Sequence, residues 1–440
     1  MRKVDRGCRN RFLSVLVLFA FAFGGLLPLF SCGTKAEEDS ELVTMLTSDF
    51  TRLAPDDDAP VDEMVESLNT FALTLLHELR EENPSEANIV FSPTSLFVPL
   101  AVVRAGALGP TREQMSLALQ TDLDDEDLLA AINTFEQRLM PEGNEDPPYK
   151  VKLTNGLWAQ KDFRFQQTFV DLLAKYLGES LRVVDFVRDF VELRDEINAW
   201  VEEQTAGEIK DLLPEGTPDV DSRLMLINTL YFDAPWERVF EISGIGPFTT
   251  LAGEEVSTEM MKQMEANHFY TYRDDAHWLD LRTRGQRYSA LIIMPDEDPV
   301  GFLSALSAQT IVDAREEMSG VRMELTVPQL DLDSFTKFVE PLKSMGMELP
   351  FLNEDANFGG IVDISDSETE GIYINDIGQR VVLRADQTRL TAVAATYVDM
   401  AQSGDPEADL TLRIDRPYYL FITDNETGAI LFASWITDPS

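Results

Sequence analysis

The sequence predicts a domain of the α+β class, on three observations. Helical patterns fall mainly in the first half of the chain, strand-like runs fall mainly in the second half, and no internal repeat or break in composition follows residue 61. Strands and helices that alternated along the chain would instead indicate a parallel sheet. With 440 residues, of which 44% are apolar, the chain can bury a large core.

The N-terminus has the composition of an export signal. Basic residues at the start of the chain precede an uncharged apolar run from Phe12 to Phe30, which is the order found in secretory signals. The run leads to Cys32 and resembles a bacterial lipobox, although Phe30 is not the small residue usual there. We expect residues 1–31 to be removed and Cys32 to carry a lipid, which gives a membrane-anchored lipoprotein facing the periplasm or the cell exterior. An uncleaved anchor is the alternative, since the run is barely long enough to span a bilayer.

Residues 32–60 predict an acidic, flexible tether. Acidic residues and two prolines dominate this segment, which has little apolar surface to bury. The folded domain is expected to cover residues 61–440. Cys8 lies in the segment that is removed, so Cys32 would be the single cysteine of the mature chain, and we expect no disulfide framework, zinc site or cysteine nucleophile.

Charge and motifs exclude several functions. A formal net charge of −42 repels nucleic acid, so no nucleic-acid partner is expected. The three histidines, His77, His268 and His277, lack the spacing of metal ligands. The sequence also has no catalytic serine elbow, phosphate loop or dinucleotide fingerprint. We therefore expect no metal, no cofactor and no enzymatic activity.

Hydrophobic periodicity places the main elements. An apolar stripe predicts a helix from Val61 to Leu79, and a second amphipathic helix covers Phe190 to Val201. The run 224–232 is apolar nearly throughout, as expected of a central strand that is covered on both faces. Further strand-like runs are 88–91, 288–294, 321–327, 381–385 and 429–436.

Six segments, read in order, resemble the serpin family of serine protease inhibitors. The most distinctive is the run 228–232, which is followed by Trp236 and Phe240. The resemblance covers residues 61–440. It implies an α+β fold with three β-sheets, about eight or nine helices and an exposed reactive-centre loop at about 387–411. The other segments are 88–95, 197–212, 260–261, 356–361 and 415–421.

Five residues form a candidate sheet-opening cluster. Ser92, Ser95 and Asn228 are small polar residues inside apolar segments, and such groups need internal hydrogen-bond partners when they are buried. The resemblance implies that they meet beneath the point where the main sheet opens, together with Trp236 and Gln379. The family usually has a histidine at the position of Gln379, and a glutamine can likewise donate and accept hydrogen bonds.

The segment between the last predicted strands has the pattern of a strand, although it begins as a loop. Its tip, 402–407, is polar and rich in turn residues, which predicts exposure and cleavage by proteases. From Leu390 to Met400, alternate residues form one face that is small or apolar throughout, and the opposite face is mixed. Such a segment can bury one side in a sheet.

The resemblance implies a suicide mechanism. A protease cuts the loop and forms an acyl-enzyme. Before hydrolysis finishes, the freed segment inserts as an extra strand of the main sheet and carries the distorted protease with it. The uncut form is then metastable, and cleavage releases the stored strain. The alternative is a non-inhibitory member whose loop is a plain protease substrate.

The loop hinge departs from the inhibitory pattern at its start. Gln387, Arg389 and Leu390 stand where inhibitory members have glutamate, glycine and threonine. We expect Arg389 to point outward to water. We expect Leu390 to be buried early in insertion, with overpacking of about 1–3 kcal/mol because leucine is larger than threonine. The other hinge residues, Ala392, Ala394 and Thr396, match the family.

The family's spacing places the cleaved bond at Ser403-Gly404, with Met400, Ala401 and Gln402 as alternatives. None of these residues is basic, so a trypsin-like target is not expected. We expect an elastase-, chymotrypsin- or subtilisin-like serine protease as the partner of a monomeric inhibitor, and a cysteine protease stays an alternative.

Overall fold

A computed structural model describes residues 42–82, 88–139, 149–205, 207, 209–365, 371–390 and 408–440. These residues belong to one compact unit of the chain, Asp39–Ser440. The expected export signal and Cys32 lie outside the described residues. Among the helices that are described, none is long and apolar enough to cross a membrane.

Nine α-helices lie within the described residues, most of them before residue 205. Helix α1 begins at Val61, as its apolar stripe predicts, and buries Phe71 and Leu75 among other side chains. Helix α2 has Pro93 in its first turn, where a backbone N–H is not needed. The helices are α1 (Val61–Glu82), α2 (Pro93–Ala105), α3 (Gly109–Ala118), α4 (Asp125–Leu139), α5 (Gln167–Tyr176), α6 (Phe186–Gln204), α7 (Pro299–Ala305), α8 (Ala308–Glu317) and α9 (Val339–Ser344), with a short 3-10 helix at Leu349–Phe351.

A seven-stranded sheet has the order β1-β4-β3-β5-β13-β12-β11. Strands β3 and β4 are parallel, and the other pairs are antiparallel. Because β13 is antiparallel to both of its neighbours, β5 and β12 run parallel to each other. The strands are β1 (Thr44–Leu46), β3 (Lys150–Gln160), β4 (Leu181–Val184), β5 (Leu224–Pro235), β11 (Leu330–Lys337), β12 (Gly378–Ala385) and β13 (Arg389–Leu390).

A nine-stranded sheet has the order β14-β10-β7-β8-β9-β15-β16-β2, and β6 pairs with β7 beside this path. The described strands thus form two hydrogen-bonded sheets where three were expected. The reason is strand β7, which runs on from its pairing with β6 and β10 into its pairing with β8. The strands are β2 (Ile89–Phe91), β6 (Glu241–Thr249), β7 (Glu255–Arg273), β8 (Ala276–Arg282), β9 (Tyr288–Pro295), β10 (Ser319–Pro328), β14 (Leu410–Arg413), β15 (Tyr418–Asp424) and β16 (Ile430–Ile436).

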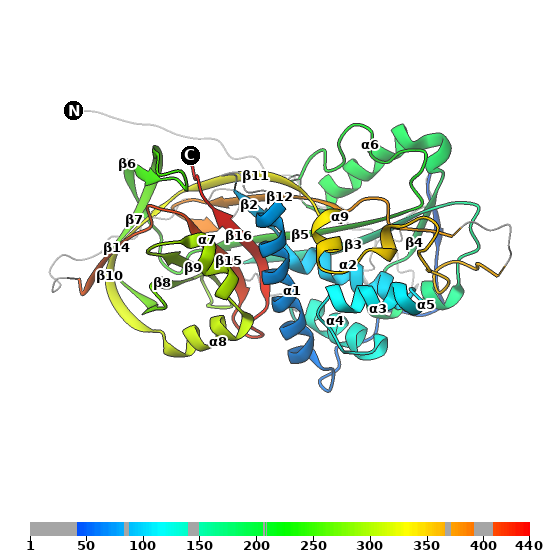
Figure 1. The fold of residues 1–440 in the computed structure, drawn as a ribbon, viewed down its shortest axis with the longest axis horizontal. Coiled ribbons are helices and arrows are strands. Elements are labelled where there is room, and N and C mark those ends of the chain that lie inside the picture. The colour runs from blue at the N-terminus through cyan, green and yellow to red at the C-terminus, as the bar shows by residue number, and fades with distance from the viewer. Residues whose placement is uncertain are drawn as a thin grey trace, which may run out of the picture. The chain divides into compact units, whose positions relative to one another are not determined.

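Helices cover the seven-stranded sheet on both faces. Helix α6 lies on one side of it, while α2 to α5 lie on the other (Figure 1). The indole rings of Trp200 in α6 and Trp158 in β3 pack edge to face, with 6.1 Å between the ring centroids. Each of the six runs that the sequence marks as strand-like forms a strand, and the α+β class is confirmed.

Residues 42–60 differ from the flexible tether that their acidic composition predicts. Strand β1 adds to the edge of the sheet by pairing with β4, and the side chain of Val43 is buried. Farther along, the Arg52 guanidinium lies 2.6 Å from the Glu136 carboxylate of α4, which is buried. Partners distant in sequence therefore hold this part of the segment against the domain, which a reading of its local composition does not detect.

Candidate functional site

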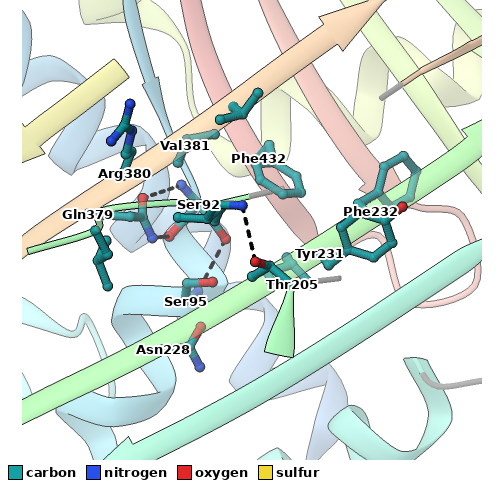
Figure 2. A pocket seen from close by; sticks show the side chains of 14 residues that line it. Ser92, Ser95, Thr205, Asn228, Tyr231, Phe232, Gln379, Arg380, Val381 and Phe432 are labelled. Carbon is teal, nitrogen blue, oxygen red and sulfur yellow. Dashed lines mark hydrogen bonds between the residues drawn. The ribbon is translucent and has the colours of Figure 1, made fainter. Parts of the chain in front are cut away.

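A gap in the seven-stranded sheet lies between β5 and β12. Strand β13 separates these two parallel strands at one end, where Leu390 pairs with Ala234 of β5 and with Ala385 of β12. No register between β5 and β12 themselves is present within the described residues. A cavity of about 40 Å³ lies between them, and Asn228, Gln379 and the start of helix α2 contribute to its walls (Figure 2).

Ser92 and Gln379 meet beneath this gap. The backbone N–H of Ser92 donates to Gln379 Oε1 over 2.7 Å, and Gln379 Nε2 donates back to the Ser92 carbonyl over 3.2 Å (Figure 2). The Ser92 hydroxyl donates to the Leu431 carbonyl of β16 and accepts from the Ser95 backbone N–H, which caps helix α2. The glutamine thus makes the two-way contact that its chemistry permits, and it ties β12 to α2.

Asn228 lines the same cavity but bonds away from Ser92 and Gln379. Its amide nitrogen donates to Asn155 of β3, and the Asn155 side chain donates to Glu136 over 3.0 Å. Burial raises the pKa of Glu136, while the neighbouring Arg52 opposes that shift. Within the described residues, neither the Ser95 hydroxyl nor Asn228 Oδ1 has a hydrogen-bond partner. Two buried polar atoms therefore lie at the cavity.

Trp236 belongs to a different part of the site. Its indole N–H donates to the Asp386 carbonyl over 2.8 Å and its backbone N–H donates to the Thr388 carbonyl over 3.0 Å. The backbone N–H of Phe240 donates to the Gln387 carbonyl over 2.7 Å, and the rings of Phe240 and Trp236 pack edge to face. The segment 236–240 thus holds the turn between β12 and β13.

Of the hinge residues that are described, Gln387 lies in the turn before β13, while Arg389 and Leu390 already lie in the sheet. The side chain of Leu390 is fully buried in the main apolar core. Arg389 differs from the expectation that it reaches water, because its guanidinium lies 2.6 Å from the carboxylate of Asp233, which is buried. Ala392, Ala394 and Thr396 lie outside the described residues, as do Met400, Ala401, Gln402, Ser403 and Gly404.

The segment after helix α6 covers the gap from outside. Leu212 lines the cavity, and Arg380 of β12 donates to the carbonyls of Lys210 and Asp211. Asn198 of α6 accepts from the Leu213 N–H over 2.8 Å and donates to its carbonyl over 3.2 Å. A strand that enters the gap along its length must therefore displace this cover.

Sequence reasoning missed several residues of the site. Asp233 at the hinge and Asn155 beside Asn228 carry contacts that long-range pairing creates, while Asp386 accepts from the backbone two residues farther on. One local signal was available at Asp386, since aspartate side chains often form turns by accepting from the backbone N–H two residues farther on.

Comparisons with known proteins identify the family. A family model described as Serpin (serine protease inhibitor) matches residues 66–439. The chain belongs to the serpin family. An uncharacterized serpin-like protein of Thermococcus kodakarensis is 30% identical to this serpin over 446 residues, which cover 98% of this chain and 99% of the relative. The leukocyte elastase inhibitor of Xenopus laevis is 29% identical over 380 residues, covering 84% and 97%.

Solved serpin structures share the fold. Tengpin, a thermophilic serpin in its native state, superposes with a TM-score of 0.78 at 25% identity and covers 90% of this chain and 100% of its own. Human thyroxine-binding globulin in complex with its hormone superposes with a TM-score of 0.75 at 22% identity, covering 86% and 99%. Serpins are generally protease inhibitors rather than enzymes, and inhibitory relatives act on serine proteases, but the family also includes non-inhibitory carriers.

Proposed function

We propose that this serpin inhibits a serine endopeptidase by loop cleavage, acyl-enzyme trapping and insertion of the freed loop between β5 and β12. The observation that carries the proposal is the pairing of Leu390 with both Ala234 and Ala385. It defines the register in which a longer strand would continue, because residues in an antiparallel pair advance in opposite directions.

Extension of β13 in this register suits the small residues of the loop. Ala394 comes to lie between Leu230 of β5 and Val381 of β12, and both of these side chains are buried. A strand places every second residue on the same face, so Ala392 and Ala394 follow Leu390 on the core side. Small side chains suit the narrow cavity between the two strands.

Thr396 would meet the polar part of the cavity. If β13 continued in the same register, Thr396 would lie between Asn228 and Gln379. Its hydroxyl can both donate and accept, and there it lies near the Ser95 hydroxyl and Asn228 Oδ1, which have no partner among the described residues. Insertion would thus fill the cavity and satisfy polar atoms that cost free energy while they are buried and unpaired.

The target and location follow from the sequence. The candidate residues Met400 to Gly404 are small, apolar or polar, and none is basic, which favours an elastase-, chymotrypsin- or subtilisin-like enzyme. The protein itself would not act as an enzyme. We place the monomeric inhibitor outside the cytoplasm, anchored to a membrane by a lipid on Cys32.

A denaturing gel tests the proposal. The protein is incubated with elastase-, chymotrypsin- and subtilisin-type proteases, and we expect a covalent complex that survives denaturation. Cleavage within 397–406 without any complex would support the non-inhibitory alternative and overturn the proposal.

Two neighbouring alanines supply a matched pair of variants. Ala394→Glu puts a charge on the core side of the inserted strand, where an unpaired buried charge costs several kcal/mol, so insertion should slow at least about a hundredfold and the variant should become a substrate. Ala395→Glu puts the same charge on the outer face and should still form the complex. Equal behaviour of the two variants would contradict the register.

A further inference from the structure

Asp386 organises the turn that leads from β12 into β13. Its Oδ1 accepts from the Thr388 backbone N–H over 2.7 Å, from the Thr388 hydroxyl over 2.7 Å and from the Arg389 backbone N–H over 3.0 Å. Its own backbone N–H donates to the Arg389 carbonyl over 3.1 Å. One carboxylate thus fixes the chain reversal that directs Leu390 back along β12.

Asp233 holds the other side of the same two residues. The Arg389 side chain is 17% exposed and the Asp233 side chain 2% exposed, and their charged atoms lie 2.6 Å apart. Arg389 is opposite Pro235, so Asp233 is the next residue on the same face of β5. If Arg389 left the sheet, this buried carboxylate would lose one charged partner, which is unfavourable.

The contacts of the 236–240 segment do not by themselves direct the hinge into the sheet. Trp236 and Phe240 bind the carbonyls of residues 386–388, which precede Arg389 and Leu390. Arg389 and Leu390 themselves are held by backbone pairing with β5 and β12 and by the two carboxylates, one at the turn and one on β5.

We propose that Asp386 and Asp233 are positioning residues that hold the loop hinge inside the seven-stranded sheet of the intact chain, so that insertion starts with Leu390 already in place. This inference rests on the proposed function for its consequence, but the placement itself can be measured without a protease. Leu390, in place of the usual threonine, fits the same arrangement, since burial of an apolar side chain stabilises the folded chain.

The test measures the accessibility of position 390. Leu390→Cys is made in the full chain with Cys8→Ser and Cys32→Ser, which leaves a single thiol, and its rate of reaction with a maleimide is compared with that of the denatured protein. We expect strong protection. Asp386→Ala and Asp233→Asn, each added to this background, should raise the rate about tenfold or more, because hydrogen bonds to charged groups contribute that much to an equilibrium.

Two matched variants serve as controls. Asp386→Asn keeps an oxygen acceptor at the turn and should react within about threefold of the parent, since an asparagine forms the same turn. Asp331→Asn removes one partner of Arg384 in an exposed ion pair of the same sheet. Exposed pairs contribute little, so this variant should leave the rate unchanged. Circular dichroism checks that each variant is folded. If Asp233→Asn does not fold, the inference is tested with Asp386→Ala alone.

Each outcome decides the inference. An unprotected thiol in the parent, or rates unchanged by both Asp386→Ala and Asp233→Asn, would overturn it. A rate change in only one variant removes the other carboxylate from the proposal.

A second measurement separates this inference from the proposed function. The number of inhibitor molecules consumed per protease trapped should rise in Asp386→Ala and Asp233→Asn, because a released hinge delays insertion while hydrolysis continues. If the parent traps no protease but its thiol is protected, the proposed function fails and the placement of the hinge stands.

Discussion

The two sheets of this serpin differ in how completely their strands are paired. Strand β15 pairs along its length with β9 on one side and β16 on the other, and every residue of β15 and β16 is buried. In the seven-stranded sheet, by contrast, the described part of the chain places only the two residues of β13 between β5 and β12.

This difference shows where a change of structure can occur. Opening the nine-stranded sheet would break hydrogen bonds on both sides of buried strands, while filling the gap between β5 and β12 would make new ones. Cleavage should therefore increase stability at the gap alone, and the nine-stranded sheet should contribute equally to the intact and the cleaved protein.

The largest effect is expected from a single cut in the loop 397–406. Insertion of residues 391–398 would add hydrogen bonds on both sides of a new strand, each contributing about 1 kcal/mol net. For a chain of this size the melting temperature should then rise by about 10 °C or more. Calorimetry of the intact and the nicked protein measures it. The Ala394→Glu variant, nicked in the same way, should show little of this gain, and a nicked parent that melts no higher than the intact one contradicts insertion.

Phe421→Ala should weaken the nine-stranded sheet without affecting the gap. Phe421 is fully buried in β15, opposite Ala433 of β16 and Leu291 of β9. Removing a buried phenylalanine ring costs about 3–5 kcal/mol through lost burial and the cavity left behind. Urea unfolding should show the same loss in the intact and the nicked forms. Unequal losses would mean that the nine-stranded sheet also rearranges on cleavage.

The sequence predicted the paired regions better than the gap. The apolar stripe from Val61 and the run 224–232 identify α1 and β5, because burial of one or both faces leaves a local periodicity. The contact of Ser92 with Gln379 was expected only through the family resemblance. Asp233 and the ordered Arg52 segment were not found, since each depends on a partner that another part of the chain supplies.

Acid should destabilise the protein partly through His268 of β7. Burial, and to a lesser degree the nearby Arg238, lowers the pKa of His268 from 6.5 to about 4. Between these values the unfolded chain binds a proton that the folded chain does not, so stability falls as the pH drops from 6.5 toward 4, by up to about 3 kcal/mol from this residue. Above pH 6.5 this residue should have no effect.

The comparison of His268→Gln with the parent isolates this contribution from that of the carboxylates. The melting temperature of the variant should fall less steeply than that of the parent between pH 6.5 and pH 4. This difference between variant and parent should be the same for the intact and the nicked forms, because His268 lies in the nine-stranded sheet. Identical pH profiles for variant and parent would show that His268 titrates alike in the folded and unfolded chains.

Gln379 gives the smallest effect and the one most specific to the gap. Gln379→Leu removes both hydrogen bonds to Ser92 and leaves the buried backbone N–H of Ser92 unpaired. The free energy of unfolding should fall by about 1–3 kcal/mol. Gln379→His, the residue usual in the family, can still accept from that N–H and should cost less than half as much. If the loop inserts in the register set by β13, Gln379 would also lie beside Thr396. Gln379→Leu should therefore reduce the gain in melting temperature after cleavage. If the variant lowers the melting temperature of the intact and the nicked forms equally, the contact of Gln379 with Ser92 stabilises the fold but takes no part in receiving the loop.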